Sequence, residues 1–489
     1  MRSTIKVDPS GVTRRRFFSR FGDGVHGAAL AWLLAGDLLP GSSALFAAVP
    51  DSVAPNDLKP RKPHFEPKAK AVIHLFMNGG PSHVDLFDPK PTLRKFAGSP
   101  ASRDILSEIE FANEIGTMLP SPFQFVRRGK CGMELSELLP HLGTCADDIT
   151  LVRSMFGEHF NHEPALYLMH SGRTIPGRPS LGAWVVYGLG SENQNLPAYV
   201  VLDDPKRLPV NGIQNWHAGW LPPMCQGTRF RSEGLPLLNL RPGEVLPSTL
   251  VEAQRELLRG LDEAHRAQRP WQPDLDARIT SYELAARMQV SATDALDISQ
   301  ENQKTQDMYG LGNPSTASYG KRCLMARRLI ERGVRFVQIF IEGQIWDAHA
   351  DLEDSLRYSC GKTDQPVAAL ITDLKQRGLL ASTLVIWGGE FGRLPLSQVR
   401  ATTGAGRDHG PSGFSMWMAG GGVKGGYAHG ATDEIGYKAV EGRVSVHDFH
   451  ATVLHLLGMN FRRLIYQRNG LDERLTDQFP ARVVQEILA

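Results

Sequence analysis

The sequence is poor in cysteine and has almost no excess of charge, and each shortage excludes a class of protein. Its five cysteines in 489 residues are widely spaced, and none forms a CxxC pair. This pattern argues against a disulfide framework and a cysteine-ligated zinc site, so we expect buried free thiols, with a single disulfide as the alternative. The formal net charge is only +2, and nothing suggests the clustered basic face of a nucleic-acid-binding protein.

The first 48 residues have the composition of an export signal. Arg14, Arg15 and Arg16 precede two phenylalanines, and a mostly apolar stretch runs from Val25 to about Leu39. That stretch is shorter than the roughly 20 residues that cross a bilayer. We predict a twin-arginine signal peptide over residues 1–48, and therefore a location in the periplasm or at the cell surface with no membrane span in the mature form. An N-terminal amphipathic helix or a retained anchor is the alternative.

Residues 49–66 are predicted to be a flexible N-terminus, and residues 67–489 a single domain. The run from Ala71 to Met77 is typical of a buried strand, and it ends in the tight turn Asn78-Gly79-Gly80-Pro81. Buried strands separated by amphipathic helices indicate an α/β fold with a mostly parallel central sheet and helices on both faces. Further strands are predicted at 149–152, 198–202, 334–341, 383–387 and 414–419, and helices at 180–188, 320–332 and 365–378.

Residues 245–310 differ from this pattern. They are charged and nearly free of strand signals, and their apolar residues recur at near-helical spacing. We predict a helical insertion that packs on the sheet.

Polar residues that directly follow the predicted strands are candidate site residues, because chemistry gathers at the carboxyl ends of strands in an open parallel sheet. After the first strand come Asn78, His83 and Asp85, which supply an imidazole and a carboxylate or, alternatively, only satisfy loop amides. A second cluster runs from Glu158 to Glu163 and contains two histidines and two carboxylates. A helix beginning near Glu163 would favour an anion at its N-terminus; capping of that helix is the alternative.

Two further clusters have the residues of a metal site. The strand at 334–341 is followed by Asp347 and His349, and carboxylate oxygen with imidazole nitrogen suits zinc or manganese, whereas extra oxygens suit magnesium or calcium. Glu390 follows the strand at 383–387 inside a glycine-rich turn, with Arg393 placed to grip an anionic ester. The alternative is an ion pair between those two residues. Asp408 and His409 lie between glycines in a later loop.

The stretch from His447 to Leu456 is also rich in histidine. Its spacing runs into an apolar repeat, which favours an N-capped amphipathic helix over a site.

These motifs together resemble the bacterial family called domain of unknown function 1501, which is grouped with the alkaline-phosphatase superfamily that includes sulfatases. The resemblance covers nearly everything after residue 66 and implies an alkaline-phosphatase-like fold. It implies that a divalent metal ion (zinc, manganese, magnesium or calcium) is held by residues that match the superfamily's ligands. The motifs are Gly79-Gly80-Pro81-Ser82-His83-Val84-Asp85, Trp346-Asp347-Ala348-His349, Gly388-Gly389-Glu390-Phe391-Gly392-Arg393 and Gly406-Arg407-Asp408-His409.

Two departures from the superfamily pattern bear on catalysis. Counting back from Gly172-Arg173 to the place of the sulfatase nucleophile reaches His162, preceded by Asn161, and no Ser, Thr or Cys stands there. Asn78 replaces the first metal-binding Asp, and an amide binds a divalent ion more weakly than a carboxylate does. The fold can therefore be inherited without the usual covalent step.

The sequence supports two functions. The first is an exported, metal-dependent hydrolase of phosphate or sulfate esters that acts on an anionic small molecule or glycan. Its catalytic residues would be His162, Asn161 and Arg393, with a water, Ser82 or Ser154 as the nucleophile. Its metal ligands would be Asn78, His83, Asp85, Asp347, His349, Glu390, Asp408 and His409. The second is a non-catalytic descendant that binds an anionic glycan or a partner protein.

Overall fold

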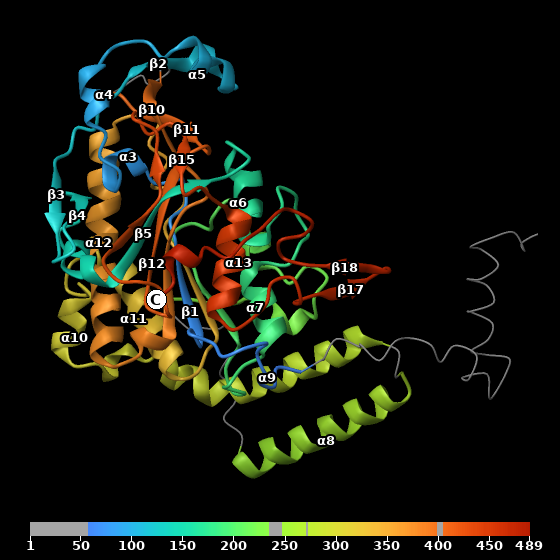
Figure 1. Ribbon diagram of the computed structural model, residues 1–489. Helices are drawn as coiled ribbons and strands as arrows, with labels where there is room; N and C mark the ends of the chain where they lie inside the picture. Colours follow the sequence, from blue (N-terminus) through green and yellow to red (C-terminus); the bar gives the residue numbers. More distant parts are fainter. Residues whose placement is uncertain (1–56, 234–246, 270–271, 399–403) are drawn as a thin grey trace, which may run out of the picture. The chain divides into compact units, whose positions relative to one another are not determined.

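The computed structural model describes residues 57–233, 247–269, 272–398 and 404–489; the predicted signal peptide lies outside them. Within these residues the centre of the molecule is a nine-stranded sheet in the order β13-β5-β12-β9-β1-β8-β6-β7, with β16 paired to β5 (Figure 1). The strands are β1 (Ala71–Phe76), β5 (Ile149–Phe156), β6 (Tyr199–Leu202), β7 (Thr228–Phe230), β8 (Phe336–Phe340), β9 (Thr383–Gly388), β12 (Phe414–Ala419), β13 (Tyr427–His429) and β16 (Val444–Ser445).

The prediction of a mostly parallel α/β sheet is confirmed. β1 pairs in parallel with β8 and β9, and β6 pairs in parallel with β7 and β8. β12 is the exception, because it runs antiparallel to both β5 and β9. A parallel strand needs a crossover connection, usually a helix, and the described residues between β9 and β12 contain two strands and no helix. β12 therefore starts at the edge where the other strands end.

Helices cover both faces of the sheet because alternate residues of each strand point to opposite faces. Ile73 and Leu75 of β1 share a core with α11 (Ala317–Glu331) and α12 (Leu352–Gln376). Val72 and Phe76 of the same strand share the other core with α7 (Leu181–Leu189) and α13 (Val446–Leu456). All six residues of β1 are buried, which explains why it reads as an apolar run broken only by His74.

The predicted insertion is helical and free of strands in its described residues. It consists of α8 (Ser248–Ala267), α9 (Pro273–Leu296) and α10 (Gln303–Met308). α9 lies beside α11, and its Ala292 and Leu296 belong to the same buried core as Ile73 of β1. Leu257 and Leu261 of α8 are 66% and 59% exposed, so that helix contributes little to the core.

A second sheet stands where the central strands end. It has three strands in the order β11-β10-β2, with β2 (Ile115–Met118), β10 (Gly392–Gln398) and β11 (Arg407–Gly410). Arg393 of β10 is opposite His409 of β11 in the register. The remaining elements include α3 (His83–Leu86), α4 (Pro91–Lys95), α5 (Arg103–Glu108), α6 (His162–Ser171), β3 (Phe125–Arg128), β4 (Met133–Ser136), β14 (Ala431–Thr432), β15 (Ala439–Glu441), β17 (Tyr466–Arg468) and β18 (Leu471–Glu473).

Three smaller predictions are tested by the described residues. All five cysteines are free thiols, and Cys131 is exposed while the other four are buried. The helix predicted after residue 447 is α13, which begins with a capping box made by Ser445 and Asp448. The described part of the segment predicted to be flexible is bonded to the domain, since the amide of Arg61 donates to Leu189 and that of His64 to Gly458.

No helix in the described residues is both long enough and apolar enough to cross a membrane.

Candidate metal centre

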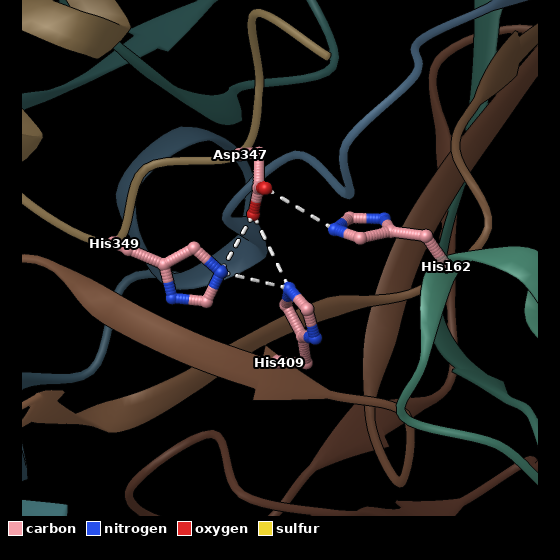
Figure 2. A group of neighbouring side chains, drawn as sticks. All are labelled: His162, Asp347, His349 and His409. Carbon is pink, nitrogen blue, oxygen red and sulfur yellow. Dashed lines mark hydrogen bonds and ion pairs between the residues drawn. The ribbon is translucent and has the colours of Figure 1, made fainter. Parts of the chain in front are cut away.

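Four side chains that could ligate a metal ion converge where the central strands end. They are His162, Asp347, His349 and His409, and one ligand atom from each lies within 4.8 Å of all the others. Figure 2 shows the three imidazoles turned toward the carboxylate of Asp347. The four residues come from three separate stretches of sequence, brought together by the sheet.

Asp347 is the centre of the group. Its Oδ1 lies 2.9 Å from His349 Nε2 and 3.2 Å from His409 Nε2, and its Oδ2 lies 3.2 Å from His162 Nε2. The two nitrogens of His349 and His409 are only 3.0 Å apart. Two imidazole nitrogens and a carboxylate oxygen at this separation surround a space that suits one small cation.

Two glycines allow the chain segments to approach this closely. Gly79 follows β1 with a φ of 108°, and a Cβ there would lie 2.6 Å from the amide nitrogen of Asp347. Gly406 precedes β11, and a Cβ there would lie 2.0 Å from the carbonyl carbon of His349. Any side chain at either position would push apart the loops that carry Asp347, His349 and His409.

His162 is the first residue of α6, whose N-cap Asn161 makes no side-chain capping bond. Its Nδ1 lies 2.7 Å from Glu390 Oε1, and the same oxygen accepts a hydrogen bond from the amide of Gly79 at 3.0 Å. Glu390 therefore stands behind His162 and orients it. A carboxylate that holds the far nitrogen of a metal-ligating histidine is the usual outer support of such sites.

The charges of the centre are strongly coupled. Burial opposes protonation of His162, but hydrogen bonds to Asp347 and Glu390 outweigh it and raise the pKa of His162 to about 9. Burial lowers the pKa of His409 to about 4, with Asp347 opposing and the Arg393 charge assisting the shift. Burial raises the pKa of Asp347, but its bonds to the three histidines and the charge of Arg393 hold that pKa well below its usual range. Without a metal ion, a proton on His162 thus bridges two carboxylates.

His349 and Asp347 each have an outer partner on β10. Gln398 Oε1 lies 2.6 Å from His349 Nδ1, which leaves Nε2 facing the centre. Sequence reasoning missed Gln398, because no pattern distinguishes it from any other polar residue at a strand end. Asp408 lies at 3.8 Å from the same Nδ1 and accepts from the amide of His409, so it adjoins the centre from outside.

Arg393 is buried, and each of its three nitrogens makes at least one hydrogen bond. Nε donates to the Gly80 carbonyl at 3.0 Å and Nη1 to the Arg407 carbonyl at 3.1 Å. Nη2 donates to the Gly79 carbonyl and to Asp347 Oδ1. Arg393 therefore fixes Asp347, and its predicted grip on an anionic ester stays a prediction.

Two predicted ligands of the first loop, His83 and Asp85, do not belong to the group. Asp85 is fully buried against Arg407, at 2.7 and 3.0 Å; burial raises its pKa, but this pairing holds it below the usual value. His83 bonds through Nε2 to the Gly436 carbonyl at 2.8 Å. Asn78 donates from Nδ2 to the carbonyls that follow β8, while its buried Oδ1 has no hydrogen-bond partner among the described residues. His83 and Asp85 anchor the loops around the centre, and a ligand role for Asn78 stays a prediction.

Neither predicted alternative nucleophile is free to act. Ser82 donates to Asp85 at 2.5 Å, and Ser154 donates to the carbonyl of Gly442 at 2.6 Å; both are buried.

The donor set fits a transition-series cation. Imidazole nitrogen suits zinc and its neighbours, whereas magnesium and calcium prefer oxygen ligands. Glu390 Oε2 is buried and has no hydrogen-bond partner among the described residues, and His162 Nε2 has only the carboxylate of Asp347, at 3.2 Å. The residues present therefore fit a bound divalent ion.

Comparison with known proteins identifies a family to which the sequence is similar. The family described as "Protein of unknown function (DUF1501)" matches residues 69–488. No functionally curated protein is significantly similar to the chain in sequence.

Solved structures give only distant matches. The lipoteichoic acid synthase LtaP from Listeria monocytogenes is 9% identical, with a TM-score of 0.34 over 83% of this chain and 76% of that chain. The PsFucS1 sulfatase from Pseudoalteromonas sp. is 12% identical, with a TM-score of 0.33 over 82% and 68%. The alkaline phosphatase from the Antarctic bacterium TAB5 is 11% identical, with a TM-score of 0.31 over 80% and 98%. Matches this distant assign no role to any residue.

Proposed function

The chain belongs to the DUF1501 family of proteins of unknown function, and we propose that it is a metal-dependent hydrolase of phosphate or sulfate esters. The observation that carries the proposal is the group of three imidazoles and one carboxylate whose ligand atoms lie within 4.8 Å. It stands at the carboxyl ends of parallel strands, where α/β proteins bind their ligands.

Zinc is the metal ion that we propose among zinc, manganese, magnesium and calcium. His162, His349 and His409 offer three nitrogens against the single carboxylate of Asp347, and this balance favours zinc. When bound, such an ion polarises an ester oxygen and makes a neighbouring water a stronger nucleophile at neutral pH.

The chain itself supplies binding and orientation. The first-turn amides of α6 are not capped by the Asn161 side chain, and a helix N-terminus favours an anion such as a phosphate or sulfate group. Glu390 and Arg393 hold His162 and Asp347 in place. Because Ser82 and Ser154 are bonded elsewhere, we assign the attack on the ester to water.

The test is metal reconstitution. Protein treated with a chelator and refilled with zinc, manganese, magnesium or calcium is analysed for metal content, and for hydrolysis of 4-nitrophenyl phosphate, bis-4-nitrophenyl phosphate and 4-nitrophenyl sulfate. We expect one zinc ion per chain and turnover of at least one ester. Asp347→Asn and His409→Ala should lose both, whereas His141→Ala, at an exposed position, should lose neither. Failure to retain a stoichiometric metal ion would rule out the proposal.

The missing nucleophile side chain favours a second function, in which the surface around the centre binds an anionic glycan or a partner protein without turnover and without help from the metal ligands. His349→Ala and Glu390→Ala separate the two functions. If affinity for a sulfated glycan is unchanged in these variants and no form hydrolyses an ester, the protein is a binding protein.

Export is a further proposal, supported by the arginines and apolar stretch of residues 1–48. We expect the protein in the periplasmic or surface fraction of its cell. Replacing Arg15 and Arg16 by Lys should retain it in the cytoplasm, and an unchanged distribution would contradict the twin-arginine route.

A further inference from the structure

A cavity opens beside the metal centre. Its volume is about 300 Å³, and its wall contains Asp408 and His409 of β11. Much of the remaining wall comes from residues 108–111, around the end of α5, and from Gly157, Glu158 and Phe160, between β5 and α6. His409 belongs both to the cavity wall and to the metal-ligand group, so the cavity adjoins the metal centre at this residue.

The wall of the cavity is acidic. Glu108, Glu110, Glu158 and Asp408 line it, and among the described residues that form the wall there is no Lys or Arg. Lys438 lies 3.3 Å from Glu108 on the exposed side and so offsets one of these charges. The remaining carboxylates make the potential in the cavity negative, which repels an anion and attracts a cation.

Aromatic rings complete the wall. Phe111 and Phe160 meet edge to face, with ring centroids 5.6 Å apart, and Phe111 is 45% exposed. An aromatic face attracts a cation, and attracts a desolvated quaternary ammonium group most of all. Carboxylates and aromatic rings in one pocket are the combination that recognises such a group.

We propose that this cavity binds a positively charged substituent of the substrate, so that the substrate is a zwitterionic ester. Its anionic phosphate or sulfate group lies at the metal centre and the N-terminus of α6, and its ammonium-bearing alcohol lies between Glu110, Glu158 and the two phenylalanines. This inference rests on the proposed ester hydrolase function and narrows its substrate class. The reaction remains hydrolysis: the water oxygen bonds to phosphorus or sulfur, the ester bond breaks, and the departing alcohol takes up the proton.

The test compares two substrates that differ only in charge. 4-Nitrophenyl phosphorylcholine carries a quaternary ammonium, and 4-nitrophenyl 3,3-dimethylbutyl phosphate is the isostere that keeps the phosphate charge and lacks the ammonium charge. With zinc-loaded protein we expect kcat/KM to favour the charged ester by about tenfold or more. Glu110→Gln and Glu158→Gln should each reduce that preference about threefold. The matched control Glu66→Gln, at an exposed position away from the cavity wall, should leave it unchanged.

Binding is measured separately from turnover. Choline and 3,3-dimethylbutan-1-ol are titrated into the zinc-loaded protein and followed by ligand-observed NMR. Choline should bind more tightly than the alcohol, and Glu158→Gln should weaken only choline. Equal rates for both esters, or a preference that survives both glutamate variants, overturns the inference and leaves the hydrolase proposal standing. Choline binding that depends on Glu158, without turnover of any ester, supports the cation pocket and refutes the hydrolase.

Discussion

Acid should destabilise this protein through a group of buried histidines on the face of the sheet covered by α7 and α13. His74 of β1, His170 of α6 and His450 of α13 are all buried. His74 Nε2, His170 Nε2 and His450 Nδ1 have no hydrogen-bond partner. Phe76 packs against His74 and His170 with ring centroids 5.4 and 4.4 Å away. A charged imidazole has no counterion in these surroundings.

The size of the effect follows from the pKa values. Burial lowers the pKa of His74 from 6.5 to about 3, and burial likewise lowers that of His450 to about 3. Between pH 6.5 and pH 3 the histidines bind protons in the unfolded chain but not in the folded chain. The free energy of unfolding is therefore highest above pH 6.5 and decreases as the pH falls toward 3. Each pH unit is worth about 1.36 kcal/mol per histidine. At pH 5 the two residues together therefore cost about 4 kcal/mol.

Burial lowers the pKa of His170 as well, so replacing His74 by Leu should remove only the part of this pH dependence that His74 contributes. Urea unfolding of the wild type and of His74→Leu, both treated with a chelator, is compared at pH 8 and pH 5. The wild type should lose about 2 kcal/mol more than the variant between the two pH values. His141→Leu, at an exposed position, should keep the wild-type slope. Parallel pH profiles for the wild type and His74→Leu would show that the imidazole is not held neutral in the core, and would refute the reasoning.

Three further predictions concern the centre and its supports. Gly79→Ala should lower the affinity for zinc while the protein stays folded, because the added Cβ would lie 2.6 Å from the amide nitrogen of Asp347. A zinc content equal to that of the wild type in elemental analysis would contradict this. Gln398→Leu should weaken zinc binding about tenfold by releasing His349, as measured by competition with a chelator, and unchanged affinity would assign Gln398 no supporting role. Arg407→Met should cost about 3–5 kcal/mol in urea unfolding, since it leaves a buried carboxylate unpaired; a loss below about 1 kcal/mol would place that pair among weak surface bridges.

Much of the sheet could be predicted because its strands are short apolar runs that end in glycine. β1, β9 and β12 begin at the residues that the pattern predicts, since strands buried on both faces consist almost entirely of apolar residues. α12 was predicted only from residue 365. It begins at Leu352 and contains Pro366 in its interior, whereas a proline inside a pattern is normally the sign of a helix start. Tertiary packing carries the helix through that position.

Which polar residues face the centre could not be predicted, because arginines that are distant in sequence decide it. Asp85 and Asp347 each follow a buried strand and look equally suited to a metal. Arg407 pairs with Asp85 through two bonds and removes it from the site. Arg393 bonds to Asp347 through only one oxygen, so the other remains open to His162. The spacing of residues in the sequence does not predict which arginine pairs with which carboxylate.

The pairing of Arg393 with Asp347 also determines the net charge of the centre, and that charge differs in sign from the charge of the neighbouring cavity. Asp347 and Glu390 bring two negative charges and Arg393 one positive charge, while the histidines that ligate a metal ion must be neutral. With a divalent ion bound, these groups sum to +1, which attracts a phosphate or sulfate group, while the carboxylate of Asp408 adjoins them at 3.8 Å from His349. The neighbouring cavity, with Glu110 and Glu158 in its wall, has the opposite sign. Two adjoining regions of opposite potential select a molecule that carries both charges, and fix which end of it reaches the metal centre.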